Sequence, residues 1–192
     1  MPSRHNVFFK DHYYHIYNRG AGKQQIFLSH ENYRYCIDLI NTYSKKFSIT
    51  VIAFCLMPNH YHFLLRQDGE ISISKFMNGI FNRYAQAFNR QHERSGTLFE
   101  GRFKDKLVDK DSYIIQLCRY IHLNPVSAHL VAKPQDWEFS DYREWIQQRK
   151  NWQFDSDIIR EYFEHPSEYA TFVTDYAEKK EKDKQFMKYL LD

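Results

Sequence analysis

The stretch MPNHYHFLL, at residues 57–65, constrains the fold of this chain most strongly. An apolar run rich in β-branched and aromatic residues, 49–56, leads into a Pro-Asn break, after which an extended pattern resumes. This arrangement predicts two antiparallel strands joined by a tight turn. Because side chains two residues apart on a strand share a face, His60 and His62 are predicted to lie side by side, with Tyr61 on the opposite face.

Two neutral imidazoles at this spacing form half of a metal site. The pair is the only His-x-His in the chain, and the run that follows it is apolar. The alternative is a surface strand whose polar face happens to carry both histidines. A metal site needs a further partner from elsewhere in the chain, so the pair alone does not decide between these interpretations.

The length and composition describe a folded chain. With 192 residues, 43% hydrophobic residues, six Gly and five Pro, the chain can bury one substantial core. No apolar run approaches the roughly 20 residues that a membrane span needs, and no signal peptide is recognisable, so we expect a cytoplasmic protein with no membrane partner. Cys36, Cys55 and Cys118 are scattered within apolar stripes, which is typical of reduced core residues.

Charge is distributed unevenly along the chain. Residues 1–126 hold 17 Lys+Arg against 10 Asp+Glu, a net charge of +7, whereas residues 127–192 have a net charge of −4. The first part would attract a polyanion, and aromatic residues, 18% of the chain, could stack on bases. The alternative is that the aromatic residues fill a core and the charges are solvated.

Periodicity predicts seven main elements. They are a strand at 13–18, a helix from the N-cap Ser29 to about Lys46, strands at 49–56 and 60–66, a helix with its apolar stripe at 73–88, a strand within 97–109, and a helix at 111–124 ended by Pro125. This order predicts an α+β protein with a ferredoxin-like antiparallel sheet covered by helices on one face.

Residues 136–192 differ in character from the rest. Short helices are predicted from Ser140 and over 155–163, followed by a long, highly charged helix over 167–191. We therefore expect one domain over residues 1–135 and a helical charged extension over residues 136–192.

Cations cluster in the first domain. Arg83 and Arg90 lie on the polar face of the helix at 73–88, and Arg102, Lys104 and Lys106 occupy alternate positions, which would place them on one face of a strand. They are candidates for phosphate contacts. The alternatives are a solvated helix face and an edge strand protected by lysines.

The stretch MPNHYHFLL and a second one, RYIHLNPV at 119–126, together resemble the HUH single-tyrosine transposases of small insertion sequences, most closely the REP-associated tyrosine transposases. The resemblance covers roughly residues 5–135. It implies that His60 and His62 bind a divalent metal, Mg²⁺ or Mn²⁺, and that Tyr120 is the nucleophile. It also places Asn124 as a third metal ligand, although Asn before Pro is a common helix terminator.

The resemblance further implies the substrate and the reaction. The substrate would be single-stranded DNA beside a hairpin, cleaved through a 5′-phosphotyrosine and rejoined without a nucleotide cofactor, by a monomer in preference to a homodimer. Arg119, beside the tyrosine, joins the candidate phosphate contacts. Tyr113 and Tyr84 are the alternative nucleophiles.

Two other functions fit the same residues. One is a non-catalytic protein that binds DNA or RNA hairpins with a ferredoxin-like sheet, in which the histidines are structural. The other is a metal-dependent nuclease that uses water and forms no covalent intermediate.

Overall fold

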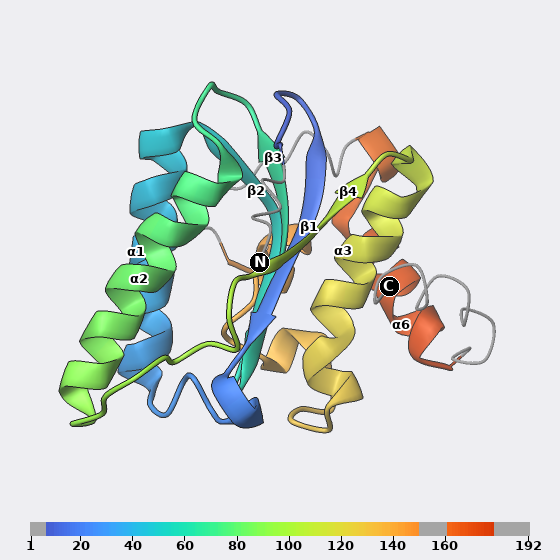
Figure 1. Ribbon diagram of the computed structural model, residues 1–192. Helices are drawn as coiled ribbons and strands as arrows, with labels where there is room; N and C mark the ends of the chain where they lie inside the picture. The colour runs from blue at the N-terminus through green and yellow to red at the C-terminus, as the bar shows by residue number, and fades with distance from the viewer. Residues whose placement is uncertain (1–6, 150–160, 179–192) are drawn as a thin grey trace.

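A computed structural model describes residues 7–149 and 161–178 of the chain. Four strands form one sheet in the order β2-β3-β1-β4, and every neighbouring pair is antiparallel. The strands are β1 (Tyr13–Arg19), β2 (Ile49–Met57), β3 (His60–Gln67) and β4 (Lys104–Val108). Helix α1 (His30–Phe47) connects β1 to β2, and α2 (Ile73–Gln91) connects β3 to β4 (Figure 1). The predicted α+β class and antiparallel sheet are confirmed.

Helices cover both faces of the sheet, so the prediction of helices on one face is wrong. Figure 1 shows α1 and α2 on one side, and α3 (Asp111–Ser127) with α6 (Pro166–Glu178) on the other. The reason is visible in β2, whose residues 52–57 are all buried. A strand that is apolar at successive positions has both faces covered.

Each face of the sheet packs its own core. On the α1 and α2 side, Ile16, Phe63 and Leu65 contact apolar residues of the two helices. On the α3 side, Cys55 and Leu64 pack against the apolar stripe of α3, as predicted for that helix. No helix within the described ranges is long and apolar enough to cross a membrane.

Two element boundaries differ from the prediction. Strand β4 begins at Lys104, so Arg102 lies in the preceding loop and does not share a strand face with the two lysines. Helix α3 passes through Pro125 and ends at Ser127, so the prediction that Pro125 ends it is wrong by two residues. The start of α1 is confirmed, with Ser29 and Asn32 forming a reciprocal capping box.

The segment after α3 closes the free edge of β2. The Leu56 amide donates to the Phe139 carbonyl at 2.9 Å, and the Phe54 amide donates to Oδ1 of Asp141 at 2.7 Å. The short helix α4 (Tyr142–Trp145) follows and buries Trp145 in the core beneath α3. These contacts satisfy backbone groups that an edge strand would otherwise leave open.

A buried polar cluster attaches α6 to α3. His122 of α3 is fully buried, with Nδ1 at 2.6 Å from the Tyr169 hydroxyl and Nε2 at 3.0 Å from Oδ1 of Asp141. Three segments distant in the sequence therefore meet at one imidazole. The division into domains 1–135 and 136–192 stays a prediction. Residues 155–160 of the helix expected at 155–163, and residues 179–191 of the one expected at 167–191, lie outside the described residues.

Candidate functional site

Alternate residues of β1 and β3 bring polar rings together on the α3 face of the sheet. Tyr17 pairs with His62, and Arg19 pairs with His60, in the antiparallel register of the two strands. The rings of His60 and His62 lie 5.2 Å apart and nearly perpendicular. The His15 ring stacks on the His62 ring, with 5.3 Å between the ring centroids, and on the Tyr17 ring, with 4.9 Å between the centroids. The predicted side-by-side placement of the His pair is thus present, and two further rings extend it.

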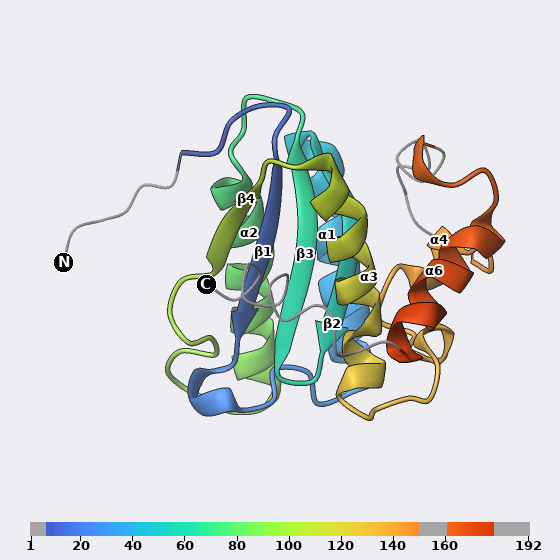
Figure 2. The same ribbon diagram turned by 90° about the vertical axis from the view of Figure 1, so that its right-hand side faces the viewer.

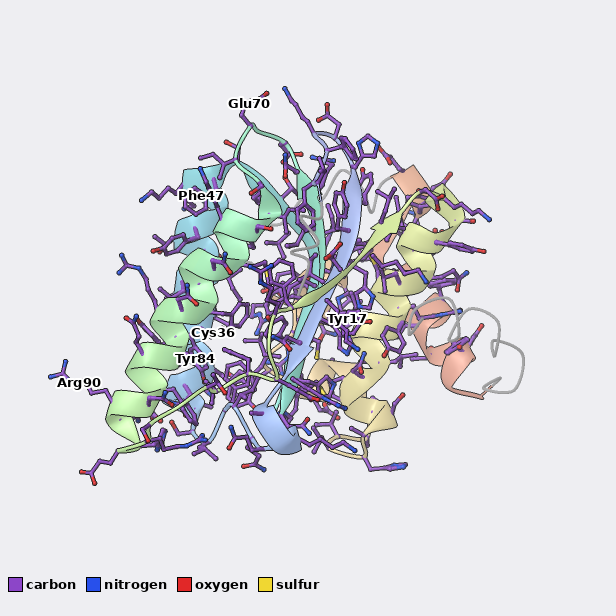
Figure 3. All side chains as sticks on the ribbon, viewed as in Figure 1. Tyr17, Cys36, Phe47, Glu70, Tyr84 and Arg90 are labelled. Atoms are coloured by element: carbon purple, nitrogen blue, oxygen red, sulfur yellow. The ribbon has the colours of Figure 1, made fainter. Side chains whose placement is uncertain are left out.

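Tyr120 of α3 faces this group of rings. Its ring meets the edge of His62 at 5.4 Å and that of His15 at 6.3 Å, and the side chain is half-buried. Figure 2, seen from the α3 side, shows α3 lying over β2 and β3, with β1 and β4 beside it and uncovered by the other described helices. Figure 3 shows Tyr17 in the space between β1 and α3.

Asn124 links the tyrosine helix to the histidine strand. Its Nδ2 donates to the Tyr120 carbonyl at 2.9 Å and lies 3.5 Å from the Ile121 carbonyl. Pro125 has no N–H to give to the Ile121 carbonyl four residues earlier, and the Asn124 amide partly replaces that donor. The carboxamide is also close enough to His60 and to the Tyr120 hydroxyl to affect the pKa of each. The sequence placed Asn124 at this site, and the structure explains how a helix can continue through it.

Burial keeps the imidazoles of the site neutral. It lowers the pKa of His60, against the opposing hydrogen bond from Asn124. Burial, with the neighbouring His15 and His60, holds the pKa of His62 well below its usual value. Burial and the positive charge of Lys106 lower the pKa of His15 to about 3. Neutral imidazole is the form that binds metal ions.

Burial has the opposite effect on the tyrosine. It raises the pKa of Tyr120 above its ordinary value, and the hydrogen bond from Asn124 only partly offsets this. The phenol is therefore protonated at neutral pH in the protein alone. A cation held beside it would favour the phenolate and reverse this shift.

The donor groups present fit a divalent cation. Nδ1 of His60 lies 2.7 Å from Oδ1 of Asn59, and Nδ1 of His62 lies 3.0 Å from Nε2 of His15. A protein partner on one ring nitrogen orients an imidazole so that the other nitrogen can bind a metal. In the described part of the chain no group of three His, Cys, Asp or Glu is placed to hold a metal ion. The available set is thus two imidazoles and the carboxamide oxygen of Asn124.

The alternative tyrosines lie elsewhere. Tyr84 is buried on the α2 side of the sheet, where its hydroxyl donates to the Ile26 carbonyl, and Figure 3 shows it beside Cys36 on that side. Tyr113 lies two helical turns before Tyr120, with the Lys110 ammonium 5.1 Å from its ring. Of the three tyrosines, Tyr120 is the one whose ring contacts the two histidines of β1 and β3.

Two of the predicted cations lie beside this site on β4. On β4, Lys104 pairs with Tyr17 and Lys106 pairs with His15. The Lys104 ammonium lies 5.8 Å from the Tyr17 ring, and Lys106 is close enough to lower the pKa of His15. These two lysines therefore lie next to the rings of Tyr17 and His15.

The other predicted cations are placed away from Tyr120. Arg102 lies in the loop before β4, where it lines a groove against α2 on the opposite face of the sheet. Arg83 and Arg90 are exposed on α2, and Arg90 points away from the molecule at the end of that helix (Figure 3). Arg119 packs its guanidinium over the rings of Phe172 and Tyr176, so it is turned toward α6.

Sequence reasoning did not assign His15 and Tyr17 to the site. Residues 15 and 17 share one face of a strand because they are two positions apart, but only the pairing register of β1 with β3 brings that face to His62. The buried contacts of His122 were also missed, because they depend on residues 141 and 169, which are far away in the sequence.

Comparisons with known proteins agree with this arrangement. The family model described as "Transposase IS200 like" matches residues 8–124. A curated REP-associated tyrosine transposase of Haemophilus influenzae is 26% identical over 125 residues, which cover 56% of this chain and 71% of that protein. A solved REP-associated tyrosine transposase bound to a REP hairpin superposes with a TM-score of 0.65 at 17% identity, over 77% of this chain and 87% of that one. That structure shows a shared fold. Since the family model matches more than half of the residues, the chain belongs to the IS200-like transposase family.

Proposed function

We propose that this chain cleaves and rejoins single-stranded DNA at palindromic hairpins through a covalent 5′-phosphotyrosine on Tyr120. The observation that carries the proposal is the contact of the Tyr120 ring with His62, which lies beside His60, with Asn124 one helical turn after the tyrosine. Membership of the transposase family supports DNA breakage and joining. The solved relative bound to a REP hairpin supports hairpin DNA as the substrate.

His60, His62 and Asn124 would hold the divalent cation of the proposed reaction, Mg²⁺ or Mn²⁺. When bound, such an ion withdraws charge from a phosphate oxygen and stabilises the charge that develops during bond breakage. The two imidazoles are neutral and oriented by Asn59 and His15, which suits this role.

The remaining steps use groups of this chain. The Tyr120 oxygen, after losing its proton, attacks the phosphorus, and the bond from phosphorus to the 3′ oxygen breaks, leaving a 3′ hydroxyl once that oxygen gains a proton. Lys104 and Lys106 would hold the phosphates of the strand beside Tyr17 and His15. Because the phosphotyrosine conserves the energy of the phosphodiester, attack by a 3′ hydroxyl rejoins DNA without a nucleotide cofactor.

Trapping the covalent intermediate tests this proposal. The protein is incubated with Mn²⁺ and end-labelled single-stranded DNA that carries the palindromes flanking its own gene, and a denaturing gel separates labelled protein from free DNA. We expect an adduct with the wild-type protein and with Tyr113→Phe, a matched control on the same helix. Tyr120→Phe should form none, a loss of at least about 10³-fold if the nucleophile is essential.

Each other outcome identifies a different function. Cleavage without an adduct would indicate attack by water and would contradict the tyrosine mechanism. Hairpin binding without cleavage, with either metal and at any pH tested, would favour a non-catalytic hairpin-binding protein. An adduct that persists in EDTA and in His60→Ala would remove the metal from the proposal.

A further inference from the structure

Arg19 is a cation beside the histidine site that belongs to neither of the two sequence motifs. It is the last residue of β1, and the register of β1 with β3 pairs it with His60. Paired residues of antiparallel strands have Cβ atoms about 4.5–5.5 Å apart and point to the same face of the sheet. Arg19 therefore lies on the face that carries the two histidines and that Tyr120 faces.

The backbone of Arg19 is held from two sides. The Gly20 amide donates to the Asn59 carbonyl at 2.8 Å, which joins the end of β1 to the turn before His60. The Glu100 amide donates to the Arg19 carbonyl at 2.9 Å. Figures 1 and 2 show the end of β1, the start of β3 and the last turn of α3 at the same end of the molecule. Arg19 thus has a fixed place at the end of the site where the tyrosine helix ends.

Glu100 fixes the direction of the Arg19 guanidinium. Nε of Arg19 donates to Oε2 of Glu100, and Nη2 donates to Oε1 at 3.0 Å, so the two groups form a bidentate pair. Among the described residues, Glu100 is the only hydrogen-bond partner of this guanidinium. Both N–H groups of Nη1 and one of Nη2 stay unused. They form a second edge that fits two oxygens of a phosphate.

The charges around this pair favour an anion. The hydrogen bond and the charge of Arg19 lower the pKa of Glu100 below its usual value, and Lys104 and Lys23 lower it further. Three cations are thus close to one carboxylate, which leaves a net positive charge beside His60.

We propose that Arg19 is a catalytic residue that binds the phosphate attacked by Tyr120 through its unused guanidinium edge, and that Glu100 positions it. The inference rests on the proposed function for the identity of this phosphate. As the Tyr120 oxygen bonds to phosphorus and the bond to the 3′ oxygen breaks, two hydrogen bonds from a donor already in place stabilise the charge on the phosphate oxygens. Arg19 stays protonated throughout.

A charge scan of the DNA tests the contact without any cleavage. The parent protein is Tyr120→Phe with Mn²⁺, and the ligand is the palindromic hairpin with its flanking single strand. An uncharged methylphosphonate replaces one phosphate of the single strand at a time. At one position we expect the loss of affinity to be about tenfold larger in the parent than in the parent carrying Arg19→Ala, the effect of one charge-assisted contact.

The rate of adduct formation shows whether this phosphate is the one that is cleaved. With Tyr120 present, Arg19→Ala should slow adduct formation at saturating DNA by about 10²-fold, as loss of a transition-state donor does. Arg19→Lys keeps the charge but not the two-pronged edge, so it should recover only part of this loss. The position that couples to Arg19 in the scan should be the linkage that the wild-type protein cuts.

Glu100→Gln tests the positioning role. It removes the charge of the carboxylate and one acceptor, so it should reduce the coupling between Arg19 and its phosphate, while Mn²⁺ binding without DNA stays unchanged. A purely structural ion pair would not alter that coupling.

Arg34→Ala is the matched control, an exposed arginine on α1 behind the sheet, and should couple to no phosphate. Since exposed ion pairs contribute little to stability, all of these variants should fold, which thermal unfolding checks.

Three results would overturn the assignment of Arg19. They are coupling to no phosphate, coupling only to a linkage that is not cut, and equal rates of adduct formation with arginine and alanine at this position. The last result would leave the proposed function intact. If the wild-type protein forms no adduct, the proposed function fails and the catalytic role with it, whereas coupling in the scan would still assign Arg19 a phosphate contact.

Discussion

His15 was not predicted from the sequence as a site residue, but the fold places it against His62 in the candidate site. Its Nε2 contacts His62 at 3.0 Å, and its Nδ1 is buried with no hydrogen-bond partner in the described ranges. If His62 donates its Nδ1 proton to His15, then Nε2 of His62 has a free lone pair for a metal, and the unpaired proton lies on Nδ1 of His15. The neutral state of His15 thus favours the tautomer that the proposed metal binding would require of His62.

The lowered pKa of His15 predicts an acid-sensitive fold. An unfolded histidine titrates near pH 6.5, whereas folded His15 has a pKa of about 3. Between these values the unfolded chain binds a proton that the folded chain does not, so this contribution to stability is complete above pH 6.5 and is lost as the pH falls. The loss is about 1.4 kcal/mol per pH unit.

Urea unfolding in EDTA at pH 7, 6 and 5 measures this slope. The His15→Gln variant retains a polar partner for His62, but glutamine does not titrate. Below pH 6.5 the free energy of unfolding of this variant should therefore fall less steeply than that of the wild-type protein, the two slopes differing by about 1.4 kcal/mol per pH unit. His165→Gln replaces an exposed histidine and should leave the slope of the wild-type protein unchanged. Identical slopes in all three proteins would contradict the burial of a neutral His15.

At the level of the element, helix α3 depends on a compensated proline. The Asn124 side chain donates to the Tyr120 carbonyl and lies close to the Ile121 carbonyl, which Pro125 cannot serve. We expect Asn124→Ala to lower the free energy of unfolding by about 1 kcal/mol, the usual net value of a hydrogen bond. In a Pro125→Ala background, where the backbone N–H returns, the same change should cost less than half as much.

A double-mutant cycle on these two positions, measured by urea unfolding in EDTA, gives the coupling energy directly. The Leu130 amide donates to the carbonyl of Pro125, a backbone group that the Pro125→Ala change keeps. This hydrogen bond should therefore not contribute to the coupling energy. An equal cost of Asn124→Ala in the two backgrounds would show that the carboxamide does not replace the missing donor.

The elements themselves were largely predictable, because local rules govern them. Ser29 as N-cap, the apolar stripe of α2 and the break at Pro58 each report on a few neighbouring residues, and the structure agrees with all three. The faces of the sheet were not predicted correctly, although the uninterrupted burial of β2 was readable from its apolar run. The start of β4 was predicted too early, because the alternating cations Arg102, Lys104 and Lys106 resemble a strand pattern although Arg102 lies before the strand.

Some residues of the candidate site could likewise be predicted from local motifs, whereas others depend on how distant segments pair. His60, His62, Tyr120 and Asn124 were identified from two short motifs and lie together in the structure. His15 could not be assigned, because a strand pattern gives the face of a side chain but not the register with the next strand. The direction of Arg119 likewise depends on α6, which lies about 50 residues further along the chain.

On the scale of the whole molecule, the second core combines both parts of the chain. Tyr142, Trp145 and Tyr169 are buried against residues of β2 and α3. Burial of one such side chain contributes about 1.5–3 kcal/mol, and the whole fold is worth only about 5–15 kcal/mol. We therefore expect a chain ending at residue 135 to lose cooperative unfolding and to bind a hydrophobic dye.

Circular dichroism during heating, with dye fluorescence, tests this expectation. A chain that ends at residue 178 keeps all of the described contacts and is the matched control. A cooperative thermal transition in the chain of residues 1–135 would instead support the predicted division into a domain and a separate extension.

The closed edge of β2 has a further consequence for self-association. Sheets of two copies can merge only through edges with unpaired backbone groups, and residues 139–141 already take up those of Phe54 and Leu56 in β2. Among the described strands this leaves β4, whose Lys104 and Lys106 would bring like charges together if two copies met there. Pairing of two copies through β4 would therefore be opposed by charge repulsion, which a polyanion bound along β4 would reduce; the monomer expected from the sequence stays a prediction.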